Sequence, residues 1–168
     1  EELRRYLECG VVAIRDGGDG PGYAWNAKQR VAARQWLGPE IVAVREAVAR
    51  EGMYGRFLGR GFRDLEHWQQ VEAGFYDQGA DQLKVIVTGI VNFAEYGKVG
   101  PVQWSPEELR ALVRSAHRRG LKVMAHASGE EGIRRAIEAG VDSIEHGYYM
   151  TTDLLEMMLS QGIAWVPT

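Results

Sequence analysis

Two similar segments in the second half of the chain constrain its fold most strongly. Each starts at a glycine that follows a predicted helix, continues as a short apolar run and reaches a histidine six residues later, Gly120 to His126 and Gly140 to His146. Glycine is the common residue just after a helix end, and a short apolar run between such signals is typical of a buried strand. The stretch therefore predicts strand, helix and strand, with both imidazoles delivered side by side at one edge of a parallel sheet.

The same order of helix, glycine and apolar run recurs along the chain. The apolar runs lie at residues 11–14, 83–87, 121–125, 141–144 and 163–166, after glycines 10, 79, 120, 140 and 162. Ser105 and Pro106, followed by two glutamates, mark a further helix start. Repeated helix–strand units predict an α/β fold with a parallel sheet, either a barrel or a doubly wound sheet.

The middle of the chain has a less regular pattern. We expect helices at residues 26–37 and 65–78, and loops at 53–62 and 90–103. The segment 41–51 has the composition of a helix but the position of a strand, and we prefer a strand at 44–50. No linker divides the chain, so residues 1–168 are expected to form a single domain.

The composition excludes several classes of protein. A net charge of −3 and a pI near 5.9 leave no electrostatic footprint for nucleic acid or an anionic membrane. No apolar run approaches the roughly 20 residues that span a bilayer. A single cysteine, Cys9, rules out an internal disulfide framework and fits a reducing compartment. We therefore expect a cytoplasmic protein that acts on a small molecule, with no nucleic-acid and no membrane partner.

The two histidines at matching strand ends favour a metal site. A single histidine there is more often a hydrogen-bonded structural residue, but two in consecutive units point to ligands for Zn, Fe, Ni or Mn. Glu145 and Ser128 lie beside them in sequence, where they could orient a ligand or contact a substrate. In a barrel, chemistry belongs at the carboxyl ends of the strands, which is where these residues are predicted.

Lys84 interrupts the apolar run of residues 83–87. Such a lysine must reach solvent, pair with a carboxylate of a neighbouring strand, or do chemistry. Burial lowers the pKa of a lysine and exposes a nucleophilic amine. A Schiff-base role is therefore one chemical interpretation of Lys84, and metal chemistry is another.

At these residues the chain resembles the amidohydrolase superfamily, in its imidazolonepropionase- and prolidase-like branch. The matching segments are residues 10–18 (GVVAIRDGG), 81–85 (DQLKV), 123–133 (VMAHASGEEGI), 139–147 (AGVDSIEHG) and 165–168 (WVPT). The resemblance implies a (β/α)8 TIM barrel with one or two divalent metals, usually zinc. It implies that Lys84 is carboxylated by carbon dioxide, that its carbamate bridges the metals, and that His126 and His146 are ligands. A metal-activated hydroxide would then attack an amide, cyclic amide or ester bond.

The chain also departs from that family pattern. The His-x-His of the first barrel strand and the aspartate of the eighth have no counterpart, so the chain would carry strands two to seven, about six of eight. We therefore expect a fragment that is inactive alone and forms a homo-oligomer or swapped dimer through its unpaired edges. A non-catalytic metal-binding or assembly module on a partial barrel is the alternative, and a Schiff-base lyase is a second rival.

Several loop residues are candidates for substrate contacts. Two arginines could clamp a substrate carboxylate, and Ser128 stands where many relatives carry a second histidine. The candidates are Tyr54, Arg56, Arg60, Asn92, Tyr96 and Ser128. The substrate itself is not readable from these residues.

Overall fold

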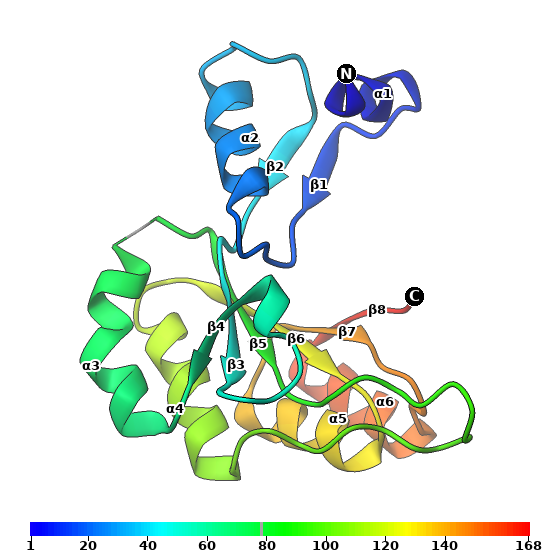
Figure 1. Ribbon diagram of the computed structural model, residues 1–168. Helices are drawn as coiled ribbons and strands as arrows, with labels where there is room; N and C mark the ends of the chain where they lie inside the picture. Colours follow the sequence, from blue (N-terminus) through cyan, green and yellow to red (C-terminus); the bar gives the residue numbers. More distant parts are fainter. Residues whose placement is uncertain (78) are drawn as a thin grey trace.

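The computed structural model describes residues 1–77 and 79–168 (Figure 1). In chain order the elements are α1 (Glu2–Glu8), β1 (Ala13–Arg15), α2 (Tyr23–Ala32), β2 (Glu40–Val42), β3 (Ala47–Arg50), the 3-10 helix η1 (Arg56–Leu58), β4 (Gly59–Phe62), α3 (Leu65–Tyr76), β5 (Gln82–Ile86), α4 (Pro106–His117), β6 (Lys122–Ala127), α5 (Glu130–Ala139), β7 (Ser143–His146), α6 (Thr152–Gln161) and β8 (Ala164–Val166).

The strands form a parallel sheet in the order β4-β3-β5-β6-β7-β8, beside a parallel pair β1-β2. A backbone hydrogen bond links the two sheets, since the Asp81 N–H, just before β5, donates to the Ala43 carbonyl just after β2. From β5 onwards each helix–strand unit adds its strand beside the previous one. This confirms an α/β fold with a partial, open barrel of parallel strands.

The two faces of the six-stranded sheet have different functions in the fold. Every second residue of the β5 segment, Leu83, Val85 and Val87, points to one face of the sheet and belongs to the large core. Helices α3 to α6 cover that face in Figure 1. Lys84 and Ile86 point to the opposite face, where Ile86 packs with Ala47 in a smaller cluster. The period of two in a strand thus separates a structural face from the face that carries the candidate site.

The helix ends follow the sequence signals. Ser105 and Glu108 form a reciprocal capping box at the start of α4, with Pro106 in the first turn. Gly140 and Gly162 end α5 and α6 in the left-handed conformation. Helix α2 begins earlier than predicted because the Asp19 carboxylate accepts the N–H groups of its first turn, and it ends at Ala32.

Two expectations about the middle of the chain need correction. The segment 41–51 is extended, as preferred, but it forms two strands, β2 and β3, separated by residues 43–46. Residues 53–62, predicted as a loop, contain η1 and β4. A Cβ at Gly59 would lie 2.1 Å from the Ala47 nitrogen, and one at Gly61 would lie 3.0 Å from the Glu51 Cα. These two glycines therefore let β4 approach β3 closely. The helix predicted at residues 65–78 is observed as α3, which ends at Tyr76; Gln78, the last residue of the predicted range, lies outside the described residues.

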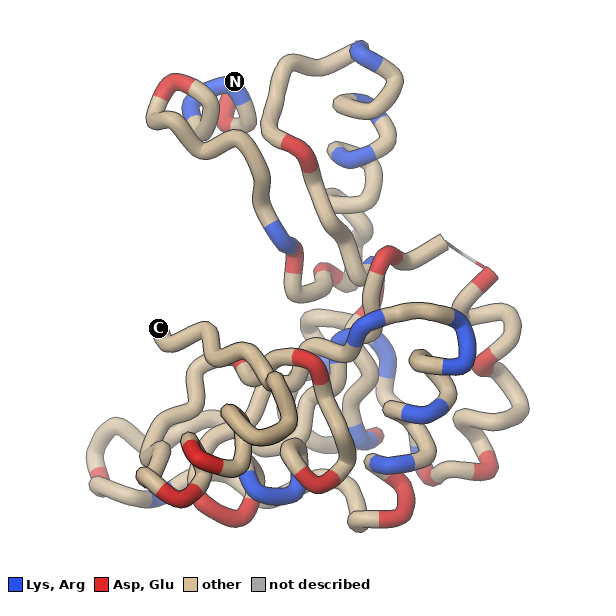
Figure 2. The backbone as a smooth tube through the Cα atoms, turned by 180° about the vertical axis from the view of Figure 1, so that it is seen from behind, with Lys and Arg blue, Asp and Glu red and all other residues tan. Residues whose placement is uncertain are grey.

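Charged residues of both signs are interspersed along the backbone (Figure 2). This distribution agrees with the small net charge of −3. Among the described residues, no helix combines the length and the apolar character that a bilayer crossing requires.

Candidate functional site

Strand register places the sequence-predicted residues on three neighbouring strands, with Lys84 in the middle of β5 and the histidines toward the carboxyl ends of β6 and β7. Lys84 is paired with Met124, Ile86 with His126, and His126 in turn with Glu145. These positions share the inner face of the sheet, away from helices α3 to α6. Neighbouring strands therefore aim an amine, an imidazole and a carboxylate at one region.

His146 reaches the same region by a different route. Register pairs it with Ala127, one step beyond His126, so the simple alternation of β7 would direct its side chain to the helical face. Its backbone has a φ of 68°, a conformation that non-glycine residues rarely adopt. The two imidazole rings lie 4.7 Å apart between centroids, at an angle of 70°. A locally strained backbone thus accompanies the approach of the two histidines, and such strain is concentrated at functional sites.

His126 is held as a neutral base. Its side chain is 8% exposed, and its Nε2 atom is buried without a hydrogen-bond partner among the described residues. Burial, followed by the nearby His146 and Lys84, lowers the pKa of His126 to about 4, against the opposing effect of a hydrogen bond with the Gly89 backbone. Burial also lowers the pKa of His146, whose Nδ1 lies 2.9 Å from the Thr168 hydroxyl.

Lys84 is 5% exposed and makes no ion pair or hydrogen bond with any described residue. The carboxylate of Glu145, on the strand beyond β6, is instead bound by Arg15 at 2.7 Å and by the Ser143 hydroxyl at 2.8 Å. Burial lowers the pKa of Lys84 to about 8, with Glu145 opposing and Arg15 adding to the decrease. The ion pair that could have explained a buried lysine is therefore not formed in the described part of the chain.

The donor set fits a divalent metal in part. The described residues contain no group of three or more His, Cys, Asp and Glu side chains that could hold a metal ion. They do contain two imidazoles whose rings are 4.7 Å apart, and one of them has a buried nitrogen that lacks a partner. An orphaned, neutral imidazole nitrogen is a typical metal donor, so His126 and His146 fit a metal that takes further ligands from elsewhere.

A cavity of about 250 Å³ opens at the two histidines. Its walls are mostly aromatic and aliphatic, and its lining residues are Tyr54, Ile90, Val91, Phe93, His126, Ser128, His146, Tyr148 and Thr168. Two of the predicted substrate contacts, Tyr54 and Ser128, are in this lining. Sequence patterns gave no reason to select Phe93 or Tyr148; their only signal is an aromatic residue in a segment between a strand end and the next helix.

The other predicted substrate contacts lie outside the cavity lining. Arg60 belongs to β4 and pairs with Glu46 at 3.0 Å, and Arg56 is exposed in η1. The Asn92 side chain accepts the Ala94 N–H, which fixes a turn. Tyr96 is 93% exposed, and its ring contacts Tyr149 at 5.1 Å.

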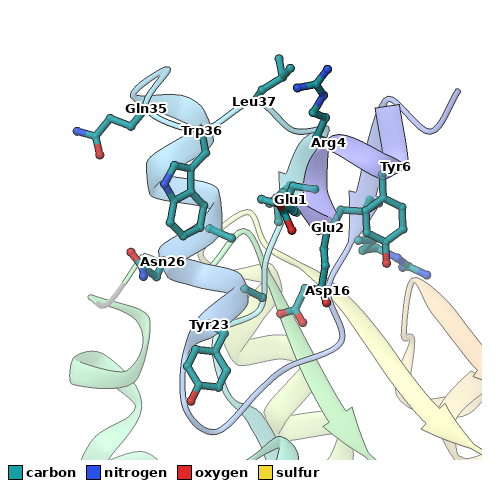
Figure 3. A pocket seen from close by; sticks show the side chains of 16 residues that line it. Glu1, Glu2, Arg4, Tyr6, Asp16, Tyr23, Asn26, Gln35, Trp36 and Leu37 are labelled. Atoms are coloured by element: carbon teal, nitrogen blue, oxygen red, sulfur yellow. The ribbon is translucent and has the colours of Figure 1, made fainter. Parts of the chain in front are cut away.

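A larger groove of about 1160 Å³ lies between α1, α2 and the β1-β2 pair (Figure 3). Trp36, Tyr23 and Asn26 extend from the α2 side, and Glu1 and Tyr6 from the α1 side. Arg15 and Asp16 also line the groove, and both affect the pKa of Lys84. Two residues of the groove lining thus act electrostatically on the buried lysine, which is not itself in the lining.

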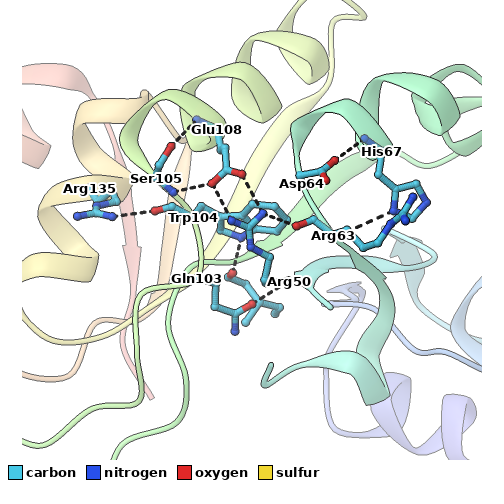
Figure 4. Close-up of polar contacts among 10 residues, drawn as sticks. Arg50, Arg63, Asp64, His67, Gln103, Trp104, Ser105, Glu108 and Arg135 are labelled. Atoms are coloured by element: carbon cyan, nitrogen blue, oxygen red, sulfur yellow. Dashed lines mark hydrogen bonds and ion pairs between the residues drawn. The ribbon is translucent and has the colours of Figure 1, made fainter. Parts of the chain in front are cut away.

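A polar network fixes the loop that carries Tyr54 (Figure 4). The amide of Gln103, which is 3% exposed, accepts the Arg50 N–H at 2.9 Å and donates to the Tyr54 carbonyl at 2.9 Å. The Arg50 guanidinium binds Glu108 at 2.8 Å and stacks over Trp104, 5.1 Å from the ring centroid. The Tyr54 ring then lies 5.4 Å from that of His126. The end of β3 and the start of α4 together position this wall of the cavity.

Residues 9–168 match the family model described as "Amidohydrolase family". The chain belongs to the amidohydrolase family. This confirms the resemblance inferred from the lysine and histidine segments.

Individual relatives of this amidohydrolase-family chain cover parts of it. An uncharacterized protein of Mycobacterium tuberculosis is 36% identical over 124 residues, which are 68% of this chain and 33% of that protein. Ochratoxinase of Aspergillus niger is 39% identical over 98 residues, 54% of this chain and 19% of the enzyme. The chain thus spans a third or less of these relatives.

A solved structure shows the same architecture. The crystal structure of a Xaa-Pro dipeptidase with bound methionine in its active site superposes with a TM-score of 0.86 at 28% identity, over 98% of this chain and 44% of the dipeptidase. Nearly all of this amidohydrolase-family chain therefore corresponds to less than half of a larger enzyme fold.

Proposed function

We propose that this chain is the central part of a metal-dependent hydrolase that cleaves an amide, cyclic amide or ester bond. The observation that carries the proposal is the convergence of His126, His146 and an unpaired, buried Lys84 on one face of the sheet. Three different strands supply these groups, Lys84 from the middle of β5 and the two histidines from the carboxyl ends of β6 and β7, the edge where barrel enzymes carry their chemistry. The names of the relatives, a Xaa-Pro dipeptidase and an ochratoxinase, support hydrolysis as the reaction.

In this proposal His126 and His146 hold a divalent metal, zinc being the usual one, and Lys84 holds it as a carbamate. The uncharged amine of Lys84 attacks carbon dioxide, forming a nitrogen–carbon bond and losing a proton to solvent. The carbamate oxygens are hard, anionic donors of the kind that complete a histidine site. When bound, the metal supplies an activated water and polarises the scissile carbonyl.

The chain's own residues prepare this chemistry. Arg15 and Ser143 both donate to Oε1 of Glu145, and Lys84 forms no ion pair with a carboxylate among the described residues. Burial keeps His126 neutral at physiological pH, with Nε2 free to donate its lone pair to a metal. Tyr54 and Ser128 contribute to the wall that a substrate would contact.

We further propose that segments outside this chain complete the barrel and that the 168-residue chain is catalytically silent by itself. The chain spans 44% of the dipeptidase structure, and the described pairing of β1 is with β2 alone, which leaves its other edge for a further strand. We propose a cytoplasmic location, which the single, exposed Cys9 supports.

A non-catalytic metal-binding or assembly module is the second candidate. It is favoured by the finding that the described residues hold no group of three or more conventional ligands. In that case His126 and His146 bind a metal weakly and Lys84 remains an unmodified amine.

The test measures zinc binding and Lys84 modification on the purified chain. Zinc affinity comes from calorimetry, and carboxylation from carbon-13 NMR in labelled bicarbonate. We expect zinc affinity to fall at least tenfold in His126→Asn and His146→Asn, and the carbamate signal to disappear in Lys84→Met. His67→Asn, which alters a histidine on α3, is the control and should behave as the wild type.

Equal zinc affinity in all variants and an absent carbamate signal would refute the proposed site. Zinc binding without a carbamate would favour the second candidate.

A further inference from the structure

The segment between β5 and α4 forms an ordered hairpin, here called the arm, beside the cavity. Two antiparallel bridges, Thr88 with Val102 and Val91 with Val99, close residues 88–102 into a hairpin. Its base is tight, since a Cβ on Gly89 would lie 2.8 Å from the Gly100 Cα. Figure 1 shows this 88–102 arm as the green hairpin that extends from the end of β5 and returns to α4. The arm therefore has a defined conformation that can present side chains.

The arm presents apolar side chains to solvent at the cavity. Phe93 is 83% exposed and Ile90 is 50% exposed, yet both line the cavity at the histidines. The ring of Tyr96, near the tip, packs edge-on against Tyr149 of the β7–α6 loop at 5.1 Å. This contact joins the arm to the loop that follows His146.

The opposite walls of the cavity are aromatic as well. The Tyr148 ring is parallel to the His146 imidazole within 5°, at 6.3 Å, and the Tyr54 ring is 5.4 Å from that of His126. Tyr149, next to Tyr148, has a φ of 66°, a conformation that non-glycine residues rarely adopt. Aromatic side chains thus flank both candidate metal ligands.

Charge is missing from this lining. Apart from the two histidines, the cavity-lining residues of the described chain include no Asp, Glu, Lys or Arg. Arg60, a sequence-based candidate for binding a carboxylate, is paired with Glu46 in β4. In the metal-free chain, a charged group placed here would lose its hydration without gaining an oppositely charged side chain from the described lining.

We propose that Phe93, Tyr54 and Tyr148 form a subsite for an uncharged aromatic group of the substrate, adjacent to the bond that is cleaved, and that Phe93 determines specificity. This rests on the proposed function for the position of the bond, while recognition of the ring depends only on the cavity. A volume of about 250 Å³ is sufficient for a phenyl ring, since cavities of about 150 Å³ hold benzene. Offset and edge-to-face contacts of three rings favour an aromatic over an aliphatic group.

Binding of small probes to the metal-free, purified 168-residue chain tests this subsite. The probes are N-acetyl-L-phenylalanine amide, its leucine analogue and its aspartate analogue, titrated by proton–nitrogen NMR. We expect the phenylalanine probe to bind most tightly and the aspartate probe at least tenfold more weakly. Phe93→Ala should weaken the phenylalanine probe about fivefold to tenfold, and Phe93→Leu should reduce its preference over leucine.

Leu159→Ala is the matched control, because Leu159 on α6 is also 83% exposed and is absent from the cavity lining. Phe93 is equally exposed, so its replacement should leave the melting temperature unchanged. Unaltered phenylalanine binding in Phe93→Ala, or equal binding of the aspartate probe, would overturn the subsite. Because EDTA is present throughout, failure of the zinc or carbamate measurements leaves this result intact, and Phe93→Ala should keep wild-type zinc affinity.

Discussion

The guanidinium of Arg15 donates to the carboxylate of Glu145 across 2.7 Å, joining two residues 130 positions apart in the chain. A second donor of the same guanidinium lies 2.9 Å from the Ser143 hydroxyl. The contact connects β1 of the small sheet to β7 of the large one. It stabilises the open barrel and determines which cation the buried carboxylate binds.

Replacing Arg15 should therefore destabilise the fold. In Arg15→Ala the Glu145 side chain, only 10% exposed, keeps a buried charge without its partner, and we expect a loss of about 2–4 kcal/mol in the free energy of unfolding. Urea denaturation measures this loss.

In the double variant Arg15→Ala with Glu145→Gln, the loss of unfolding free energy should be smaller than the sum of the two single losses by about 1 kcal/mol or more. Arg4→Ala, which removes a solvent-exposed ion pair with Glu8, should cost less than about 1 kcal/mol. Additive effects at Arg15 and Glu145 would contradict the coupling.

Replacing Lys84 should stabilise the chain. The folded-state pKa is about 8, below the unfolded value of about 10.4, so the folded state disfavours the proton that the unfolded state retains. At pH 7, without carbon dioxide and metal, Lys84→Met should gain about 1–3 kcal/mol, since each pKa unit corresponds to about 1.4 kcal/mol. Wild-type stability should rise between about pH 8 and 10 relative to that of the variant. Lys122→Met, at an exposed position on β6, should show neither effect. A destabilised Lys84→Met would show that the amine has a stabilising partner.

Acid should destabilise the chain through His126. The folded-state pKa of His126 is about 4, below the unfolded value of about 6.5. Between about pH 6.5 and pH 4 the unfolded state therefore binds a proton at this histidine and the folded state does not. Wild-type stability should therefore fall from about pH 6.5 to pH 4, by up to about 3 kcal/mol, and His126→Asn should remove much of this slope. Chemical denaturation at a series of pH values measures both. The same slope in wild type and variant would assign the acid transition to other groups.

The outer strand β8 should promote self-association of the isolated chain. All three residues of β8 are exposed, including Trp165 and Val166, and its described pairing is with β7 alone. Such an edge can pair with another chain, so we expect a concentration-dependent dimer or larger oligomer in light scattering. Val166→Lys should shift the equilibrium toward monomer, because a charged side chain at an edge opposes pairing. A monomeric wild type across the accessible concentration range would rule out this edge as an interface.

Much of the fold was predictable because its signals are local. Glycine after a helix, the Ser105–Pro106 helix start and the apolar runs depend on neighbouring residues, and they gave the parallel α/β arrangement. Glycines also produced the error at residues 59–62, because the same residue type marks a loop and permits close strand packing. Only the neighbouring β3 distinguishes the two.

The sequence by itself determined which chemical groups the chain brings to the sheet edge: one lysine in an apolar run and two histidines at equal spacing from a helix end. Tertiary structure decided how they meet. Register offset His146 by one position from His126, and a φ of 68° accompanies its return to the same region. In the folded chain Arg15, and not Lys84, forms the ion pair with Glu145. Residues 88–102 fold into the hairpin that carries exposed aromatic side chains. These outcomes depend on residues distant in sequence, whose competition for one partner or one space is settled only when the strands are packed together.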